Sequence, residues 1–298
     1  DTIVLSFTVE WKPKCLFSIS AAKKLMSYGW KILAADLVGT VYQQLRSFII
    51  GKVYTSSDLA YYNQGKKFPD LITTNVDGTI STVLFPAMSN YSDDKERVGK
   101  MVSRAMRVSS FVIFPLMIGL AAISKPLVLI MLTDKWLPAV PFMQIMCISG
   151  AINSVTNANL QAMKAIGRSD IVLKLEFAKK PVGLLMIVVT MNISVTAIAW
   201  TMPVYAIYAA AVNMKPNKNL IGYGLKRQIK DLIPATFYSL AMYFAIKVVS
   251  WVELPILFSL ILQVMTGAGV YLALAYFTKA DAFQYIVGYG KDLIKRKI

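Results

Sequence analysis

The sequence contains no histidine and only two cysteines, Cys15 and Cys147. Histidine is the most common metal ligand and a frequent general base near neutral pH, so its absence removes the residue on which many catalytic sites depend. The two thiols show no metal-ligand spacing and indicate neither a disulfide framework nor a zinc site. Charged residues are also scarce, at 16% of the 298 residues. We therefore expect no catalytic residues, no metal and no cofactor, which suits a protein that is not an enzyme.

Hydrophobic residues are abundant instead, at 56% of the chain with a mean hydropathy of +0.54. A bilayer core needs roughly 20 apolar residues in a helix, and lipid cannot satisfy an unpaired backbone. The run 181–214 is too long for one crossing and needs two helices, separated by a turn at Asn192-Ile193-Ser194, with the first starting near Ile171. The sequence therefore predicts an all-α polytopic membrane helix bundle of about eight transmembrane helices. The apolar runs cover residues 30–51, 69–90, 108–132, 138–163, 181–214, 233–250 and 255–277.

Basic residues outnumber acidic ones by 32 to 16, and their placement alternates along the chain. Of the 32, 25 lie in every second connection, while the other connections hold six and Arg46 lies inside a span. Basic loops face the cytoplasm, so this pattern predicts a multi-pass protein of the bacterial plasma (inner) membrane with both ends cytoplasmic. It argues against a nucleic-acid partner and favours contact with anionic lipids. The basic segments are 12–31, 95–107, 164–180, 215–230 and 279–297.

Several motifs occur in a fixed order: SYGWKILAADLVGTVYQQLRSFIIGK, SSDLAYYNQGKKFPDL, VLFPAMS, DKWLPAVPFMQI, NLQAMKAIGRSD and LKLEFAKKP. This order resembles the Wzx-type or teichuronic-acid-exporter-like polysaccharide flippases of the multidrug/oligosaccharidyl-lipid/polysaccharide exporter superfamily. The resemblance implies two six-helix lobes, often with two further helices. DTIVLSFTV, at the start of the chain, is typical of the last turns of a helix that begins upstream. We therefore expect the C-terminal portion of such a protein, without its N-terminal lobe.

The resemblance and the apolar runs together predict four divisions of the chain. Residues 1–28 are expected to hold the end of an upstream helix and a cytoplasmic linker, and 29–214 the second six-helix lobe. Residues 215–232 are expected to form a basic cytoplasmic connector. Residues 233–298 are expected to hold two extra transmembrane helices and a basic tail.

VYQQLRSFIIGK, residues 41–52, places an arginine inside a predicted span. A guanidinium that faces lipid costs between about 3 and more than 10 kcal/mol, so its helix face is expected to line a bundle interior or a water-filled cavity. The alternative is an arginine near the outer end that snorkels to the headgroups. At 3.6 residues per turn the same stripe contains Asp36, Thr40, Gln43, Arg46 and Ser47.

The next predicted helix, running inward from about Pro69, offers a partner for this arginine. Arg46 lies six residues before Lys52, and Asp77 lies seven residues after Asp70. At about 1.5 Å per residue, both would lie roughly 9–10 Å below the outer surface. Equal depth on antiparallel neighbours predicts an Arg46–Asp77 salt bridge, whose role is either structural or functional.

Residues 149–168 carry a second polar stripe, with its amides in mid-membrane and its cations toward the cytoplasm. Amides suit sugar hydroxyls, but they also hydrogen-bond helices to one another, and both interpretations stay open. The stripe consists of Asn153, Asn157, Gln161, Lys164 and Arg168.

A basic face at the same level completes a predicted cytoplasmic mouth, for which an anchor to anionic lipid is the alternative. Glu176 and Lys180 form an i,i+4 pair that is expected to be only local. The mouth consists of Arg97, Lys100, Arg104, Arg107, Lys164 and Arg168.

By resemblance, the expected function is a flippase for a polyprenyl-diphosphate-linked oligosaccharide in bacterial surface polysaccharide synthesis, working by alternating access. The resemblance leaves open a contact with the polysaccharide polymerase machinery. A multidrug-type exporter of the same superfamily is the nearest alternative, and a polyprenyl-lipid scaffold, a membrane-embedded glycan polymerase or a glycosyltransferase are further ones. The expected substrate pathway contains Asp36, Gln43, Arg46, Asp77, Asn153, Asn157 and Gln161.

Overall fold

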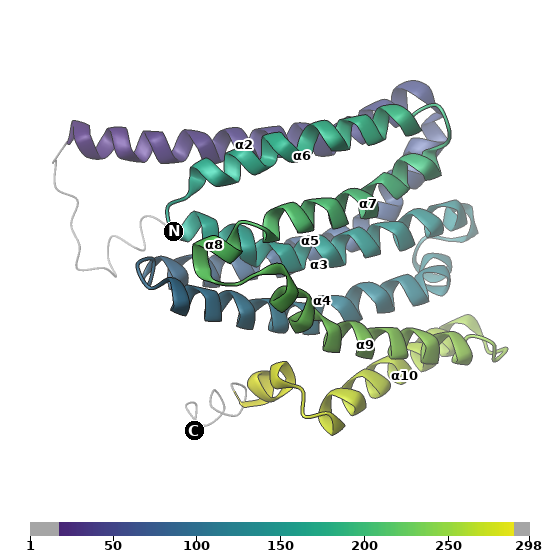
Figure 1. Ribbon diagram of the computed structural model, residues 1–298. Helices are drawn as coiled ribbons and strands as arrows, with labels where there is room; N and C mark the ends of the chain where they lie inside the picture. The colour runs from purple at the N-terminus through teal and green to yellow at the C-terminus, as the bar shows by residue number, and fades with distance from the viewer. Residues whose placement is uncertain (1–17, 289–298) are drawn as a thin grey trace, which may run out of the picture.

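A computed structural model describes residues 18–288, and this part of the chain is helical throughout its regular structure, without strands. Cys15, most of the predicted 1–28 segment and the end of the basic tail lie outside the described residues. The helices, shown in Figure 1, are α2 (Ile19–Val53), α3 (Ser56–Ser89), α4 (Lys95–Met131), the 3-10 helix η1 (Asp134–Ala139), α5 (Val140–Ala165), α6 (Ser169–Thr190), α7 (Val195–Met214), α8 (Asn217–Ile221), α9 (Leu225–Val249) and α10 (Ile256–Phe277).

The predicted polytopic helix bundle is confirmed, with one long helix at each of the eight predicted crossings. Five of these helices, α4, α5, α7, α9 and α10, are long and apolar enough to cross a membrane by composition alone. The other three, α2, α3 and α6, are 35, 34 and 22 residues long but carry more polar side chains. All eight helices are therefore long enough to cross a membrane, and five of them are also apolar enough.

Several helices begin well before the apolar runs that predicted them, and α2 and α3 show why. α2 starts at Ile19, where the Ser18 side chain accepts a hydrogen bond from the Ala21 backbone N–H. α3 starts at Ser56, where Thr55 and Asp58 form a reciprocal capping box. The start of α3 therefore precedes Pro69, its predicted start, by 13 residues.

The predicted connector at 215–232 is not an open loop, because it contains α8 and the first turns of α9. The Ser103 and Tyr223 hydroxyls both donate to the Asp231 carboxylate, which joins α4 to α9. Burial raises the pKa of the Tyr223 hydroxyl, so this group remains a donor. Gly99 of α4 lies directly against the backbone carbonyl of Ile221, where a larger residue would clash. The connector is thus packed onto the bundle.

α5 lies at the centre of the bundle and packs against α3, α4 and α7. Its side chains Met143 and Val155 belong to the largest buried apolar cluster, together with Ile113 of α4. α2 and α6 lie side by side along one edge, and α9 and α10 pack against α4 at the opposite edge (Figure 1). Gly183 allows the close approach of α6 to α2, since a Cβ at this position would clash with the Tyr42 side chain.

The connections alternate between the two ends of the bundle, as the charge pattern predicts (Figure 1). At one end, the Tyr28 hydroxyl donates to the Lys164 carbonyl, 2.9 Å away, and Asn217 bonds to Asn159. At the other end, the Tyr54 hydroxyl donates to the Met191 carbonyl at 2.9 Å. The basic connections within the described residues therefore meet at one end.

Candidate functional site

A cavity of about 630 Å³ lies between the α2–α6 pair and the helices α3, α5 and α7. Its volume falls within the range of about 300–1,000 Å³ that is usual for ligand sites. α2, α3 and α6 are the long helices that are not apolar enough to cross a membrane by composition alone. All three contribute charged side chains to the wall of this cavity. Since the cavity offers these groups a polar environment, it explains how helices of such composition pack within a membrane bundle. The ionisable residues of these three helices on the wall are Asp36, Arg46, Lys66, Asp70, Asp77, Glu176, Lys179 and Lys180.

Six of the seven side chains predicted for the substrate pathway line this one cavity. They come from three helices: α2, α3 and α5. The seventh, Gln161, does not line the cavity but lies one turn along α5 from Asn157, to whose side-chain oxygen its amide donates at 3.1 Å. The structure therefore brings together residues more than 100 positions apart in the sequence. The six are Asp36, Gln43, Arg46, Asp77, Asn153 and Asn157.

Arg46 is 3% exposed and is held by aromatic and hydroxyl groups. Its guanidinium donates to the Tyr42 hydroxyl at 2.7 Å and to the Thr201 hydroxyl of α7 at 3.3 Å. The guanidinium carbon also lies 4.6 Å from the centroid of the Tyr42 ring and 6.0 Å from that of Tyr205. The prediction that this face lines an interior is confirmed, and snorkelling to the headgroups is excluded by the burial.

The predicted Arg46–Asp77 salt bridge is wrong, because within the described residues no ion pair joins these two side chains. The error lies in the start of α3. Asp77 is 21 residues from Ser56, or about 31 Å along the helix, whereas Arg46 is seven residues, or about 10 Å, from the end of α2. The two residues therefore lie at different depths of the same cavity.

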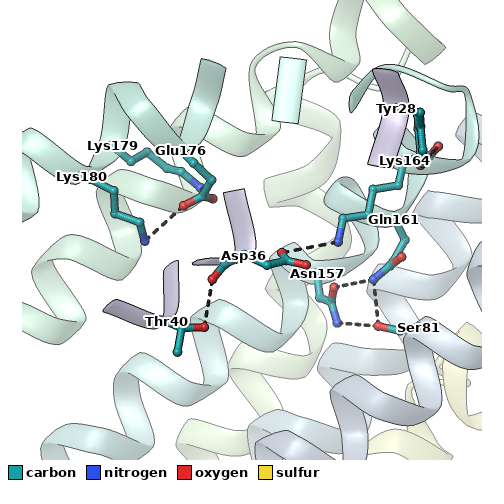
Figure 2. A network of polar contacts seen from close by, with 10 residues as sticks. All are labelled: Tyr28, Asp36, Thr40, Ser81, Asn157, Gln161, Lys164, Glu176, Lys179 and Lys180. Atoms are coloured by element: carbon teal, nitrogen blue, oxygen red, sulfur yellow. Dashed lines mark hydrogen bonds and ion pairs between the residues drawn. The ribbon is translucent and has the colours of Figure 1, made fainter. Parts of the chain in front are cut away.

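A charged cluster lies on the α6 side of the cavity, where the sequence predicts only a local ion pair (Figure 2). The Glu176 carboxylate pairs with both Lys179 and Lys180, the latter at 3.1 Å. Lys179, only 4% exposed, also donates to the Asn213 side chain of α7 at 2.9 Å. The Lys180 ammonium lies 4.5 Å from the centroid of the Tyr42 ring on α2.

The Glu176–Lys180 pair is present as predicted, but it is not only local, because the cluster joins three helices. The signal for it was in the sequence: three ionisable residues, Glu176, Lys179 and Lys180, stand in the middle of a 22-residue helix. Intramembrane charges are costly and normally mark a functional or paired site. Counting 164–180 as a basic connection concealed this signal.

The amides of the α5 stripe hydrogen-bond to α3 (Figure 2). Asn157 donates to the Ser81 hydroxyl at 3.3 Å, and Gln161 donates to the same oxygen at 2.8 Å. Of the two open interpretations, joining of helices thus applies to Asn157 and Gln161. One carboxylate oxygen of Asp77 is buried without a hydrogen-bond partner among the described residues.

At the basic end, α2 leans onto α5 beside the cavity (Figure 2). The Lys164 ammonium lies 3.9 Å from the Asp36 carboxylate, and the Tyr28 hydroxyl donates to the Lys164 backbone carbonyl. These are contacts between the two sides of the cavity, so they narrow its opening toward the basic loops.

None of the six residues predicted for the basic mouth lies on the wall of the large cavity. Lys164 comes nearest, through its pair with Asp36. Lys100 pairs with Glu96 and Arg168 with Asp170, both on their own helix ends. The four basic residues of α4 do not reach the cavity, because α3 and α5 lie between α4 and the cavity. Those four are Arg97, Lys100, Arg104 and Arg107.

Comparison with known proteins confirms the resemblance seen in the motifs. A family model described as "Polysaccharide biosynthesis protein" matches residues 1–141, slightly less than half of the chain. The chain is 27% identical over 184 residues to an uncharacterized membrane protein in the cps region of Klebsiella pneumoniae, covering 60% of this chain and 37% of that protein. It is 24% identical over 218 residues to the teichuronic acid biosynthesis protein TuaB of Bacillus subtilis, covering 73% and 44%.

Among solved structures, the lipid II flippase MurJ in an inward closed conformation has the same fold, with a TM-score of 0.68. The sequences are 16% identical, and the match covers 93% of this chain and 59% of the MurJ chain. The chain thus spans less than half the length of the two curated relatives described above.

Proposed function

We propose that this polysaccharide-exporter-like chain is one lobe of a flippase that moves a polyprenyl-diphosphate-linked oligosaccharide across the bacterial inner membrane. Its similarity to polysaccharide biosynthesis proteins and its fold, shared with a lipid II flippase, support the proposal. The observation that carries it is a polar cavity inside a membrane bundle whose α2–α6 side holds three cations, Arg46, Lys179 and Lys180. The carboxylates on that side are Glu176, paired with the two lysines, and Asp36, paired with Lys164 at the basic end.

The composition of the cavity fits the parts of such a substrate. A diphosphate needs cations, and a guanidinium with aromatic support and two ammonium groups provide them. Glycan hydroxyls need hydrogen-bonding partners, and Asn153 and Gln43 lie on the same wall. The prenyl tail can remain in lipid, so the protein needs no apolar cavity of matching length. A multidrug-type site would instead be expected to be mainly apolar with few cations.

The cavity is only partly enclosed by this chain, and we propose that a second lobe of similar size covers its open side. The relatives are more than twice as long as the segment that matches them, which supports this partner. Alternating access would then rock the two lobes against each other around a fixed central site. The contacts of Asp36 and Tyr28 with Lys164 would be made and broken as the basic end closes and opens.

Export should require both lobes. Residues 1–298 in proteoliposomes are expected not to move a polyprenyl-diphosphate-linked oligosaccharide, whereas co-reconstitution with a six-helix partner lobe should restore movement. The measurement is the fraction of oligosaccharide that an impermeant glycosidase can reach from the opposite face. Movement by this chain alone would contradict the two-lobe proposal. Absence of movement with both lobes present and folded would contradict the flippase proposal.

The basic end is proposed to face the cytoplasm, because positively charged connections are retained there. The test uses single cysteines in a chain that also carries Cys15→Ser and Cys147→Ala. An impermeant maleimide added to intact cells should label Glu253→Cys, in the α9–α10 connection, but label Asn219→Cys, in α8, only after lysis. Both positions are exposed. Labelling of Asn219→Cys from outside would reverse the orientation.

A further inference from the structure

A second, smaller cleft of about 220 Å³ lies at the basic end of the bundle, between α4 and the helical turns that follow α10. It shares no residue with the large cavity. Two arginines one helical turn apart, Arg104 and Arg107, face it from α4. The segment after α10 contributes Asp281, Ala282 and Tyr285, and Val108 completes the lining.

The two guanidinium groups are only partly satisfied within residues 18–288. Arg107 places one terminal nitrogen 2.8 Å from the Asp281 carboxylate, but its Nε is buried without a hydrogen-bond partner there. Arg104 forms no ion pair in that part of the chain, and its guanidinium carbon lies 5.1 Å from the centroid of the Tyr285 ring. An arginine over an aromatic ring keeps its in-plane N–H groups available as donors. The cleft therefore has two cations, one anion and unused donors.

The cleft is held in shape by contacts deeper in the bundle. The Tyr271 hydroxyl of α10 donates to the Phe111 carbonyl of α4 at 2.7 Å, and the two rings lie 5.1 Å apart. The Tyr238 hydroxyl of α9 lies 2.6 Å from that of Thr278, at the end of α10. Because α9 and α10 are tied to α4 and to each other, the arginines do not depend on a ligand to be brought together with Tyr285.

A phosphate is the anion that matches these donors, since arginine binds phosphate oxygens through paired N–H groups. Its source is indicated by the surroundings. The cleft lies at the end of membrane helices, beside the strongly exposed apolar side chains of Tyr276 and Phe277. We propose that this cleft binds the headgroup phosphate of an anionic phospholipid, whose acyl chains lie along α10. This site is separate from the transport cavity and does not depend on the proposed function.

The test measures binding of phosphatidylglycerol to the purified full chain by native mass spectrometry, with thermal unfolding in detergent as a second readout. The double variant Arg104→Gln/Arg107→Gln is expected to weaken phosphatidylglycerol binding by about tenfold or more, since two charge-assisted donors are lost. The matched control, Arg97→Gln/Lys100→Gln, removes the same charge from the same helix outside the cleft and should change binding by less than about twofold.

Asp281→Asn separates a lipid site from a purely structural ion pair. It removes the competing carboxylate, so phosphatidylglycerol should bind at least as tightly as to the unchanged chain. Loss of lipid binding in this variant would overturn the proposal, as would unchanged binding in the double arginine variant. A last experiment replaces the lipid with inorganic phosphate. If phosphate alone stabilised the protein as lipid does, with the same dependence on both arginines, the ligand would be a soluble anion and the lipid assignment would be wrong.

Discussion

Glu176→Gln is expected to lower the free energy of unfolding by about 3–5 kcal/mol, the usual cost of leaving a buried charge without its partner. Glu176 is 14% exposed and is paired with two ammonium groups, of which Lys179 is 4% exposed. After the substitution, Lys179 would retain only the neutral Asn213 side chain. Unfolding by denaturant in detergent micelles measures the effect.

The second half of this experiment also removes Lys179, the more deeply buried of the two cations that lose their partner. Glu176→Gln/Lys179→Met is expected to recover most of the lost stability, because an apolar side chain of similar length replaces a buried charge pair at little cost. Asp170→Asn, which alters an exposed pair in the first turn of the same helix, serves as the control and should change stability by less than about 1 kcal/mol. A loss below about 1 kcal/mol in Glu176→Gln would show that water in the cavity screens the cluster.

Arg46→Gln is expected to lower export by about 10- to 100-fold while costing only about 1–2 kcal/mol of stability. The two effects separate because the hydrogen-bond partners of Arg46, Tyr42 and Thr201, are neutral, so no buried charge is left behind. The loss of a cation from the cavity wall, in contrast, removes a contact for the diphosphate. Export is measured by glycosidase access in proteoliposomes that contain both lobes.

Two companion variants show whether charge is what matters. Arg46→Lys keeps the cation and should retain part of the export. Lys52→Gln removes an exposed cation from the last turn of the same helix and should leave export unchanged. Export by Arg46→Gln at more than half of the normal rate would contradict a role for this residue in binding the substrate.

The helix bundle, its alternating ends and the polar face of α2 could all be predicted from the sequence. These features follow from free-energy costs that can be assigned to one segment of the chain at a time. The length of an apolar run of about 20 residues is a property of a single helix. The free-energy cost of exposing a guanidinium such as that of Arg46 to lipid is also set by a single helix. The basic residues of each connection can be counted separately, and their number indicates which connections lie at the same end of the bundle. The motif order also indicated the resemblance that the comparisons confirm.

Which polar groups contact one another could not be predicted and depends on how the helices pack. The partner of Arg46 depended on where α3 begins and on the packing of α2 beside α6 and α7, and neither follows from spacing along one helix. Lys179 and Lys180 were counted with a basic connection, and only the packing of α6 against α2 and α7 places them at the cavity. The depth of a polar side chain in the bundle and the helices that surround it are set only when the helices pack together. Thus the sequence could predict that charges must be sheltered, and the fold alone could show which helices shelter them.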